Sequence, residues 1–261
     1  MHAPIYERIG QTYDETRKAD PEITNQLLTL LNPSPEGRYL DIGCGSGNYT
    51  QALFMRSVLV EGIDISSTML TKARKKYPYM AFHQGDATEL AFVDQAYDGA
   101  ICVMATHHIG DYAKAFDEIY RILKPGRFVI FTVTQEQMTN YWLCHYFPTM
   151  LQKSMAIMAS YDELSCALRQ SGFSHISSAP FFVSNQLQDW FLHAGKYRPE
   201  IYLEPAVRAG ISSFQLFAEP MELEQGLKSL EKDIKTGAIN DIIQRYENKL
   251  GDCLFVTAEK R

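Results

Sequence analysis

The stretch Tyr39–Asn48, which reads YLDIGCGSGN, joins a run of strand-forming residues to a helical pattern that begins at Tyr49. Its three glycines stand at alternate positions. Glycine adopts backbone angles that clash for other residues, and it leaves no side chain between the backbone and a ligand. We therefore expect a sharp turn that exposes the backbone at the carboxyl end of a first strand, where open α/β sheets bind their ligands.

Two kinds of ligand fit a glycine turn at this position. A dinucleotide fingerprint reads G-x-G-x-x-G, and its third glycine packs the helix against the strand. Here the spacing is G-x-G-x-G, and Asn48 stands where the dinucleotide pattern has Gly or Ala. Asp41 directly precedes the turn, where its carboxylate would repel a pyrophosphate and attract a cationic group. A tight turn without a ligand is the remaining alternative, although three glycines raise the entropy cost of folding.

Strand and helix patterns alternate along the N-terminal half of the chain. This alternation predicts an α/β fold with a parallel sheet and right-handed crossovers. The segment 184–250, which precedes the last expected strand, has mostly helical patterns. The expected strands are 38–42, 58–64, 80–84, 98–104, 127–133, 173–183 and 253–258. The expected helices are 5–31, 49–55, 66–76, 111–123 and 161–172.

The bulk composition limits the classes of partner. The chain has 261 residues, of which 46% are hydrophobic and 21% are charged, as in an ordinary globular domain. Its formal net charge of −6 disfavours a nucleic-acid partner, which usually requires a basic surface. No apolar run is long enough to span a membrane, and the N-terminus has no signal-peptide core.

The cysteines indicate a reducing compartment. Their odd number, wide spacing and lack of a C-x-x-C pair favour reduced thiols, and hence a cytoplasmic location, over disulfides. The same spacing disfavours a zinc site, so we expect no bound metal. We expect each cysteine to lie in or near the core as a small apolar residue. The five residues are Cys44, Cys102, Cys144, Cys166 and Cys253.

Taken together, the motifs of residues 35–133 resemble those of class I S-adenosylmethionine-dependent methyltransferases. The glycine turn is followed in order by VEGIDISSTML at 60–70, GDA at 85–87 and RILKPG at 121–126. The sequences of these motifs resemble those of the small-molecule branch of the family, which includes ubiquinone/menaquinone-biosynthesis and natural-product methyltransferases. The match covers half of the chain in sequence, order and spacing.

The resemblance implies a Rossmann-like, doubly wound sheet that is mostly parallel, with an antiparallel last strand. We expect a single methyltransferase domain with four parts. These are an N-terminal helical lid at 1–35, a cofactor-binding core at 36–183, a helical substrate or lid insertion at 184–250 and a final strand at 251–261.

The resemblance also implies a binding site for S-adenosyl-L-methionine. The glycine loop, with Gly43, Gly45 and Gly47, would lie against the amino-acid and ribose portions of the cofactor, and Asp41 would reach its amino group. Asp64 would accept hydrogen bonds from both ribose hydroxyls, because a carboxylate has two acceptor oxygens for two adjacent donors. For Asp64, the alternative is an acid that favours the N-terminus of the next helix.

Further along the chain, the resemblance implies contacts with the adenine and the methionine. Ile65 and Met69 would flank the adenine ring. Asp86, after Gly85, would accept from the adenine amino group, while the Ala87 N–H donates to the ring; the alternative for Asp86 is a turn or N-cap aspartate. Val103 or Met104, at the end of the fourth strand, would offer its backbone to the methionine portion.

The N-terminal segment carries Tyr13 and Arg17 one helical turn apart, on one face. The resemblance suggests that this helix covers the cofactor, and Arg17 would pair with the cofactor carboxylate. The alternative is a surface salt bridge from Arg17 to a neighbouring acid, namely Asp14, Glu15 or Asp20.

Methyl transfer requires that a nucleophile be placed against an activated carbon and that water be excluded, so a general base is not always needed. His107 and His108, after the fourth strand, are the candidate bases, because imidazole titrates near neutral pH. The alternative is a structural role in their loop. His145 and His193 are expected to be hydrogen-bonded histidines at the edge of the core.

The segment 188–199 contributes aromatic residues and two cations, which suits an apolar pocket above the cofactor, although these residues also need a core of their own. We therefore expect methyl transfer to a small molecule with an O, N or C nucleophile, in secondary-metabolite or cofactor biosynthesis. The alternatives are an RNA or protein methyltransferase and a non-catalytic cofactor-binding module. A nicotinamide dehydrogenase is disfavoured by Asp41 and Asn48. The oligomeric state is left open.

Overall fold

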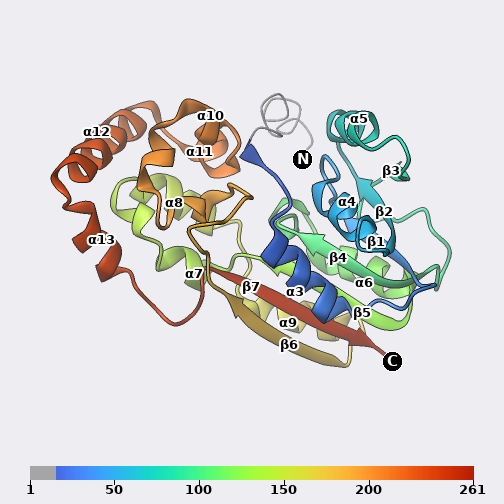
Figure 1. The fold of residues 1–261 in the computed structure, drawn as a ribbon. Helices are drawn as coiled ribbons and strands as arrows, with labels where there is room; N and C mark the ends of the chain where they lie inside the picture. Colours follow the sequence, from blue (N-terminus) through green and yellow to red (C-terminus); the bar gives the residue numbers. More distant parts are fainter. Residues whose placement is uncertain (1–15) are drawn as a thin grey trace.

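The computed structural model describes residues 16–261, which form one seven-stranded sheet flanked by helices (Figure 1). The strand order is β3-β2-β1-β4-β5-β7-β6, and β7 is antiparallel to both of its neighbours. This confirms the expected Rossmann-like fold with an antiparallel last strand. The strands are β1 (Arg38–Ile42), β2 (Leu59–Asp64), β3 (Phe82–Gln84), β4 (Tyr97–Val103), β5 (Leu123–Thr132), β6 (His175–Phe181) and β7 (Cys253–Lys260).

The strand order reverses direction between β1 and β4, which pair in parallel. Ligands of open α/β sheets bind at such a reversal, outside the carboxyl ends of the strands. Asp41 near the end of β1, Asp64 at the end of β2 and Val103 at the end of β4 therefore meet at the same edge of the sheet.

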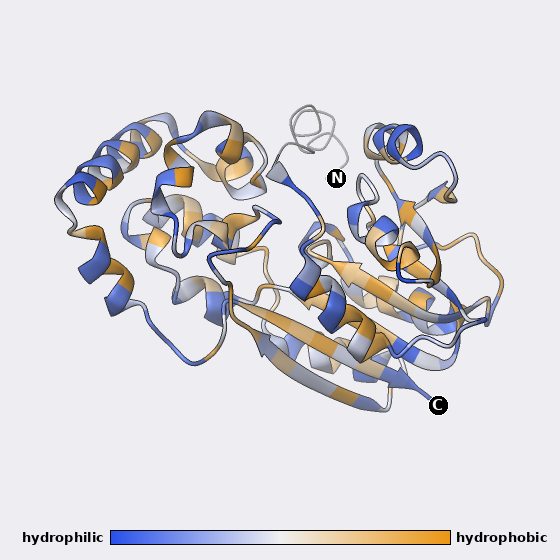
Figure 2. Ribbon diagram, viewed as in Figure 1, coloured by the Kyte–Doolittle hydropathy of each residue, from blue (hydrophilic) through white to orange (hydrophobic). Residues whose placement is uncertain are grey.

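Alternating side chains of the central strands divide the core into two layers. On β5, Val129 and Phe131 join the layer that includes α3, whereas Phe128 and Ile130 join the layer of α6 and α9. Figure 2 shows the hydrophobic residues concentrated on the central strands. The helices of this core are α3 (Pro21–Leu31), α4 (Asn48–Phe54), α5 (Ser67–Lys76), α6 (Tyr112–Ile122) and α9 (Tyr161–Gln170).

The prediction of a continuous helix at 5–31 is wrong for residues 17–20, which are not helical. Asp20 instead caps α3, because its carboxylate accepts hydrogen bonds from the Glu22 and Ile23 N–H groups, and Pro21 stands at the first helical position. Residues 17–20 are thereby directed toward the edge of the sheet where the strands end.

A helical cap stands beside the carboxyl edge of the sheet (Figure 1). It is built from two connections, whereas only 184–250 was expected to supply an insertion. The β5–α9 connection supplies α7 (Gln135–Thr139), η2 (Trp142–His145) and α8 (Pro148–Met155). The β6–β7 connection supplies η3 (Leu192–Gly195), η4 (Pro199–Leu203), α10 (Pro205–Ala209), α11 (Ser212–Phe217), α12 (Pro220–Thr236) and α13 (Ile239–Arg245).

Aromatic packing and hydrogen bonds join the two parts of the cap. The Phe147 and Phe214 rings pack edge to face with their centroids 5.3 Å apart. The Tyr146 hydroxyl donates to the Asp233 carboxylate at 2.9 Å. Gly226 on α12 lies against this junction, where an added Cβ would come within 2.4 Å of Phe147 and 2.6 Å of the Tyr146 carbonyl oxygen.

Gly226→Ala should therefore destabilise the protein, although alanine is favoured over glycine in a helix by about 1 kcal/mol. The clash with a backbone carbonyl should lower the free energy of unfolding by about 1–3 kcal/mol, as in other overpacked interiors. Urea denaturation measures this change. Ser229→Ala, at an exposed position of the same helix, is the matched control and should leave stability within about 0.5 kcal/mol. An increase in stability for Gly226→Ala would contradict the packing described here.

Candidate functional site

The glycine loop between β1 and α4 has the sharp geometry that its sequence predicts. Gly43, Gly45 and Gly47 all have positive φ, at 68°, 54° and 79°. Side chains with a Cβ rarely adopt this left-handed conformation. The Gly43 and Cys44 N–H groups both donate to the Ile63 carbonyl, so the loop is tied to the end of β2.

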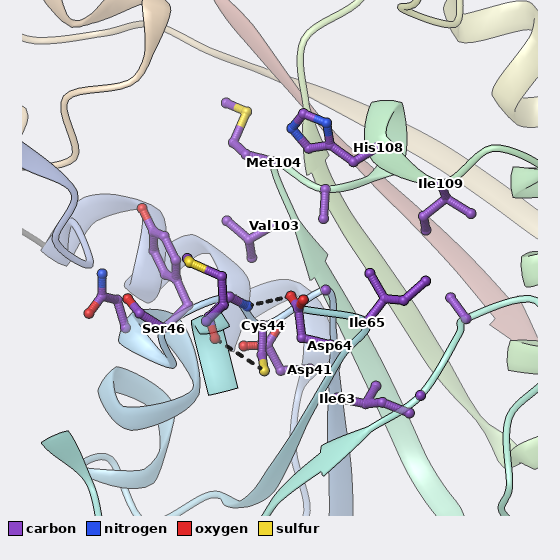
Figure 3. Close-up of a pocket in the computed structure, with 18 of the residues that line it drawn as sticks. Asp41, Cys44, Ser46, Ile63, Asp64, Ile65, Val103, Met104, His108 and Ile109 are labelled. Carbon is purple, nitrogen blue, oxygen red and sulfur yellow. Dashed lines mark hydrogen bonds between the residues drawn. The ribbon is translucent and has the colours of Figure 1, made fainter. Parts of the chain in front are cut away.

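Asp64 organises the loop from the end of β2. One of its carboxylate oxygens accepts a hydrogen bond from the Gly45 N–H at 2.8 Å (Figure 3). The other accepts from the Ser66 N–H, also at 2.8 Å. Burial raises the pKa of Asp64, and backbone N–H donors oppose that rise. Each oxygen keeps a further acceptor position, because a carboxylate oxygen accepts more than one hydrogen bond.

Asp41 lies behind the loop and is only 2% exposed. Its carboxyl accepts a hydrogen bond from the Thr50 hydroxyl at 2.7 Å. Burial, with a smaller contribution from the charge of Asp64, raises the pKa of Asp41 to about 7. A cation placed between these two acids would favour their ionised forms.

A cavity of about 320 Å³ opens at this edge of the sheet, and it gathers most of the residues that the sequence singles out (Figure 3). Gly47 does not line it and instead stands at the N-cap of α4. His107 lines a neighbouring cavity, and Tyr13 lies outside the described residues. The expected residues that line the cavity are Arg17, Asp41, Gly43, Gly45, Asp64, Ile65, Met69, Gly85, Asp86, Ala87, Val103 and His108.

Asp86 forms a turn, which is the alternative role that the sequence offered for it. Its Oδ1 accepts hydrogen bonds from the N–H and the hydroxyl of Thr88, both at 2.9 Å. Ile65 is half exposed at the cavity, whereas Met69 is buried beneath it.

Arg17 pairs with Asp189, a partner that the sequence reasoning missed. The Arg17 Nε lies 2.5 Å from one Asp189 oxygen, and the Tyr49 hydroxyl donates to the other at 3.1 Å. Asp20 also reaches this segment by accepting from the Gln188 N–H at 2.9 Å. Both residues of the ion pair line the cavity, so the N-terminal segment and the 184–250 segment meet at its wall. No local motif marks Asp189, because its partner is distant in sequence.

A second cavity, of about 50 Å³, lies beside the first and shares Arg17, Met104 and His108 with it. His107 and His193 line this second cavity. Burial lowers the pKa of each of these two histidines to about 4, and the charge of Arg17 adds to the effect at His107.

Two of the expected roles for the outer histidines are wrong. His193 was expected to be hydrogen-bonded, but it is 1% exposed and neither ring nitrogen has a hydrogen-bond partner. His145 is exposed, and its ring packs on the edge of Tyr146. Position in the sequence did not reveal these environments, because both depend on how the cap folds.

The five cysteines are free thiols, and Cys166 is exposed rather than in the core as expected. Its position on the outer face of α9 explains this. Within residues 16–261, no helix combines the length and apolar character needed to cross a membrane. The same part of the chain contains no group of three or more His, Cys, Asp or Glu residues arranged to hold a metal ion.

Comparison with known proteins identifies the family. Residues 40–131 match the family model described as a methyltransferase domain. A similar solved structure comes from Anabaena variabilis and is described as a methyltransferase from an antibiotic biosynthesis pathway. The two sequences are 32% identical and the TM-score is 0.85. The match covers 94% of this chain and 99% of the Anabaena chain. This chain belongs to the class I S-adenosylmethionine-dependent methyltransferases.

Curated relatives of this methyltransferase match over shorter stretches. An O-methyltransferase of Pyrenophora dematioidea is 29% identical over 133 residues, which are 48% of this chain and 50% of the relative. A demethylmenaquinone methyltransferase of Chlorobaculum parvum is 35% identical over 92 residues, which are 35% of this chain and 38% of the relative. The chain thus spans about half the length, or less, of these curated relatives. These matches confirm the predicted resemblance to the small-molecule branch of the methyltransferase family.

The cofactor of the family is S-adenosyl-L-methionine, and the larger cavity fits its chemistry. The cofactor carries an ammonium and a sulfonium, and it presents two ribose hydroxyls. Asp41 and Asp64 supply carboxylates whose raised pKa values a cation would lower, and Asp64 keeps acceptor capacity for hydroxyl donors. The left-handed glycines leave the backbone accessible without a Cβ in the way.

Asp41→Asn should change how stability depends on pH. Because the pKa of Asp41 is about 7 in the folded protein and near 3.9 in an unfolded chain, the folded state binds the extra proton between these values. Its contribution to the free energy of unfolding is therefore complete at low pH and is lost as the pH rises through about 7. Asparagine keeps the acceptor for Thr50 and removes this dependence.

Urea titrations of the cofactor-free protein should accordingly show the variant gaining stability relative to the wild type as the pH is raised from about 5 to about 8. Asp117→Asn, at an exposed position of α6, is the matched control and should show no such trend. A constant difference between Asp41→Asn and the wild type would refute the assigned protonation of Asp41.

Proposed function

We propose that this protein transfers the methyl group of S-adenosyl-L-methionine to a small-molecule acceptor. The observation that supports this most directly is the cavity at the ends of β1, β2 and β4, where buried acids face a glycine loop. It offers carboxylates to a ligand that carries cations and hydroxyls.

In this proposal, the predicted site residues that line the larger cavity have roles toward the cofactor. Asp64 accepts from the ribose hydroxyls, and Asp41 accepts from the ammonium group. The Gly43 and Gly45 backbones lie against the methionine and the ribose, and Val103 supports the methionine from the end of β4. The adenine is held by four further residues, namely Ile65, Met69, Asp86 and Ala87.

Arg17 is proposed to approach the cofactor carboxylate while paired with Asp189. It lines the cavity and is 13% exposed, so its guanidinium is within the site and shielded from solvent. Guanidinium groups offer five donors, which allows one arginine to serve an internal acid and a ligand carboxylate together.

The chemistry asks little of the protein beyond positioning. When bound, the cofactor supplies a methyl carbon activated by the adjacent sulfonium. The chain orients the acceptor and keeps water away, and His108, which lines both cavities, is placed to receive a proton from the acceptor. The segments 16–35 and 184–250 are proposed to act as the lid, because their residues Arg17 and Asp189 meet at the cavity wall.

A small molecule is favoured over RNA or protein as the acceptor. The net charge of −6 disfavours a polyanion, and Asp189 of the β6–β7 connection lines the cavity together with the glycine loop. The Anabaena protein described as belonging to an antibiotic biosynthesis pathway supports a role in natural-product biosynthesis for this chain. The five free cysteines support a cytoplasmic location.

Asp64→Asn should weaken binding of S-adenosylhomocysteine, the product form of the cofactor. Loss of a charged acceptor for the ribose hydroxyls should cost about 1.5–3 kcal/mol, or about 10- to 100-fold in Kd. Isothermal titration calorimetry measures this change. Glu89→Gln, which removes one negative charge at an exposed position, is the matched control and should bind as the wild type does. If the wild-type protein binds neither S-adenosylmethionine nor its product, the proposed function fails.

The class of acceptor is tested with methyl-tritiated S-adenosylmethionine. The protein is incubated with a cell extract that is then separated into small molecules, RNA and protein. Label should accumulate in small molecules other than the cofactor itself, because the net charge of −6 disfavours a polyanionic acceptor. Label in RNA or protein would instead support the corresponding alternative.

A further inference from the structure

The second cavity contains a buried polar side chain whose hydrogen bonds are not made within the described protein. His193 is 1% exposed, and both of its ring nitrogens lack hydrogen-bond partners. The Nδ1 of His107, which lines the same cavity, also lacks one. An unsatisfied buried polar group costs about 1–3 kcal/mol, so a ligand that supplies the missing partner regains that free energy.

The position of the cavity connects it to the methyl end of the proposed cofactor site. Met104 and His108 line both cavities, and Figure 3 shows them together at the edge of the larger one, away from Asp64 and Ile63. Met104 has a positive φ of 50°, which is uncommon for a residue with a side chain. Its N–H donates to the Phe131 carbonyl at 2.7 Å, so the strained residue is fixed at the end of β4.

Most of the remaining wall is apolar and suits a flat hydrocarbon group, and its polar side chains are Arg17, Ser212 and Ser213. Methionine side chains adapt to the shape of such a group. The ring of His193 packs against the ring of Tyr141, with their centroids 4.2 Å apart. Of the described residues that line the cavity, none is a carboxylate. The apolar side chains of the wall are Met104, Val133, Met138, Met158, Phe191, Leu192 and Ile211.

The imidazole of His193 is neutral in this setting. The charged groups that act on it are Asp252 and Lys196, which form an ion pair with each other at 2.8 Å. Burial is the larger influence and holds the pKa of His193 near 4. A neutral imidazole has one donor and one acceptor, which is the complement of a hydroxyl group.

We infer that the second cavity is the acceptor subsite and that His193 binds the reacting hydroxyl of a neutral aromatic or enolic acceptor. This inference rests on the proposed function and specifies its substrate class. With a volume of about 50 Å³, the cavity holds only the hydroxyl-bearing end of the acceptor. An ammonium is disfavoured because no carboxylate of the described wall would offset its burial.

The corresponding step is an O-methylation. The acceptor oxygen forms a bond to the methyl carbon while the carbon–sulfur bond breaks and its electron pair stays on sulfur. The proton of the hydroxyl passes to the imidazole of His108 and then to water. His193 orients the hydroxyl, and its low pKa makes it a poor proton acceptor.

The test measures binding of two simple probes, phenol and toluene, to the protein saturated with S-adenosylhomocysteine. The probes have similar shape, and only phenol has a hydroxyl. The wild type should bind phenol about tenfold more tightly than toluene, which is the worth of about one good hydrogen bond. Ligand-observed NMR gives the two affinities, and the ¹⁵N signals of labelled His193 should shift on addition of phenol.

His193→Phe should abolish the preference for phenol, since it keeps a ring against Tyr141 and removes both nitrogens. His145→Phe, at an exposed position, is the matched control and should retain the preference. Calorimetry with S-adenosylhomocysteine should give the same Kd for His193→Phe as for the wild type, which also shows that the variant is folded.

The outcomes separate this inference from the function on which it rests. Failure of the wild type to bind S-adenosylhomocysteine would remove the proposed function itself. If that binding is intact, equal affinity for the two probes or binding of neither probe would overturn the hydroxyl subsite. An unchanged preference for phenol in His193→Phe would overturn the role of His193.

Discussion

The hydrogen bond from the Gly45 N–H to the Asp64 carboxylate is the contact on which the site depends. It joins the loop after β1 to the end of β2, and the Ile63 carbonyl reinforces the same junction by accepting from two loop N–H groups. With the loop held in this way, Asp41 is buried behind it and the two acids act on each other. The fold thus stores an electrostatic cost in the free protein that a cationic ligand relieves.

The cap depends on this edge of the sheet through the N-terminal segment. Asp20 caps α3 and so ends the non-helical stretch 17–20. Its carboxylate also accepts from the Gln188 N–H, and Arg17 pairs with Asp189. One short stretch is therefore connected to the core helix and to the β6–β7 connection. Because Arg17 also lines both cavities, its ion pair with Asp189 joins the β6–β7 connection to the walls of both.

The features that could be predicted from sequence are those set by local patterns. The apolar runs, the acids that follow them and the left-handed glycines are close in sequence, so the order of β1, β2 and β4 and the position of Asp64 followed from the chain itself. Asp20 and Pro21 also carry a local signal, the N-cap and first helical residue of α3, which a continuous helix from 5 to 31 overlooked. The structure of the cap could not be predicted in this way. It depends on contacts between distant segments, which no spacing rule reports. These contacts decide the contribution of 135–155, the partner of Arg17 and the unsatisfied ring of His193.

The two cavities divide the chemistry by charge. Acids stand behind the glycine loop, whereas the described wall of the second cavity has no carboxylate and contains neutral imidazoles. Methyl transfer begins with a positive charge on sulfur and disperses it as the reaction proceeds. A carboxylate beside the sulfur would stabilise the starting charge more than the dispersed one and would raise the barrier, because only interactions stronger in the transition state accelerate the step. Acids that hold the ammonium and the ribose, away from the acceptor, bind the cofactor without that penalty. The apolar wall and the unpaired imidazole then favour a neutral acceptor at the place where the charge is dispersed.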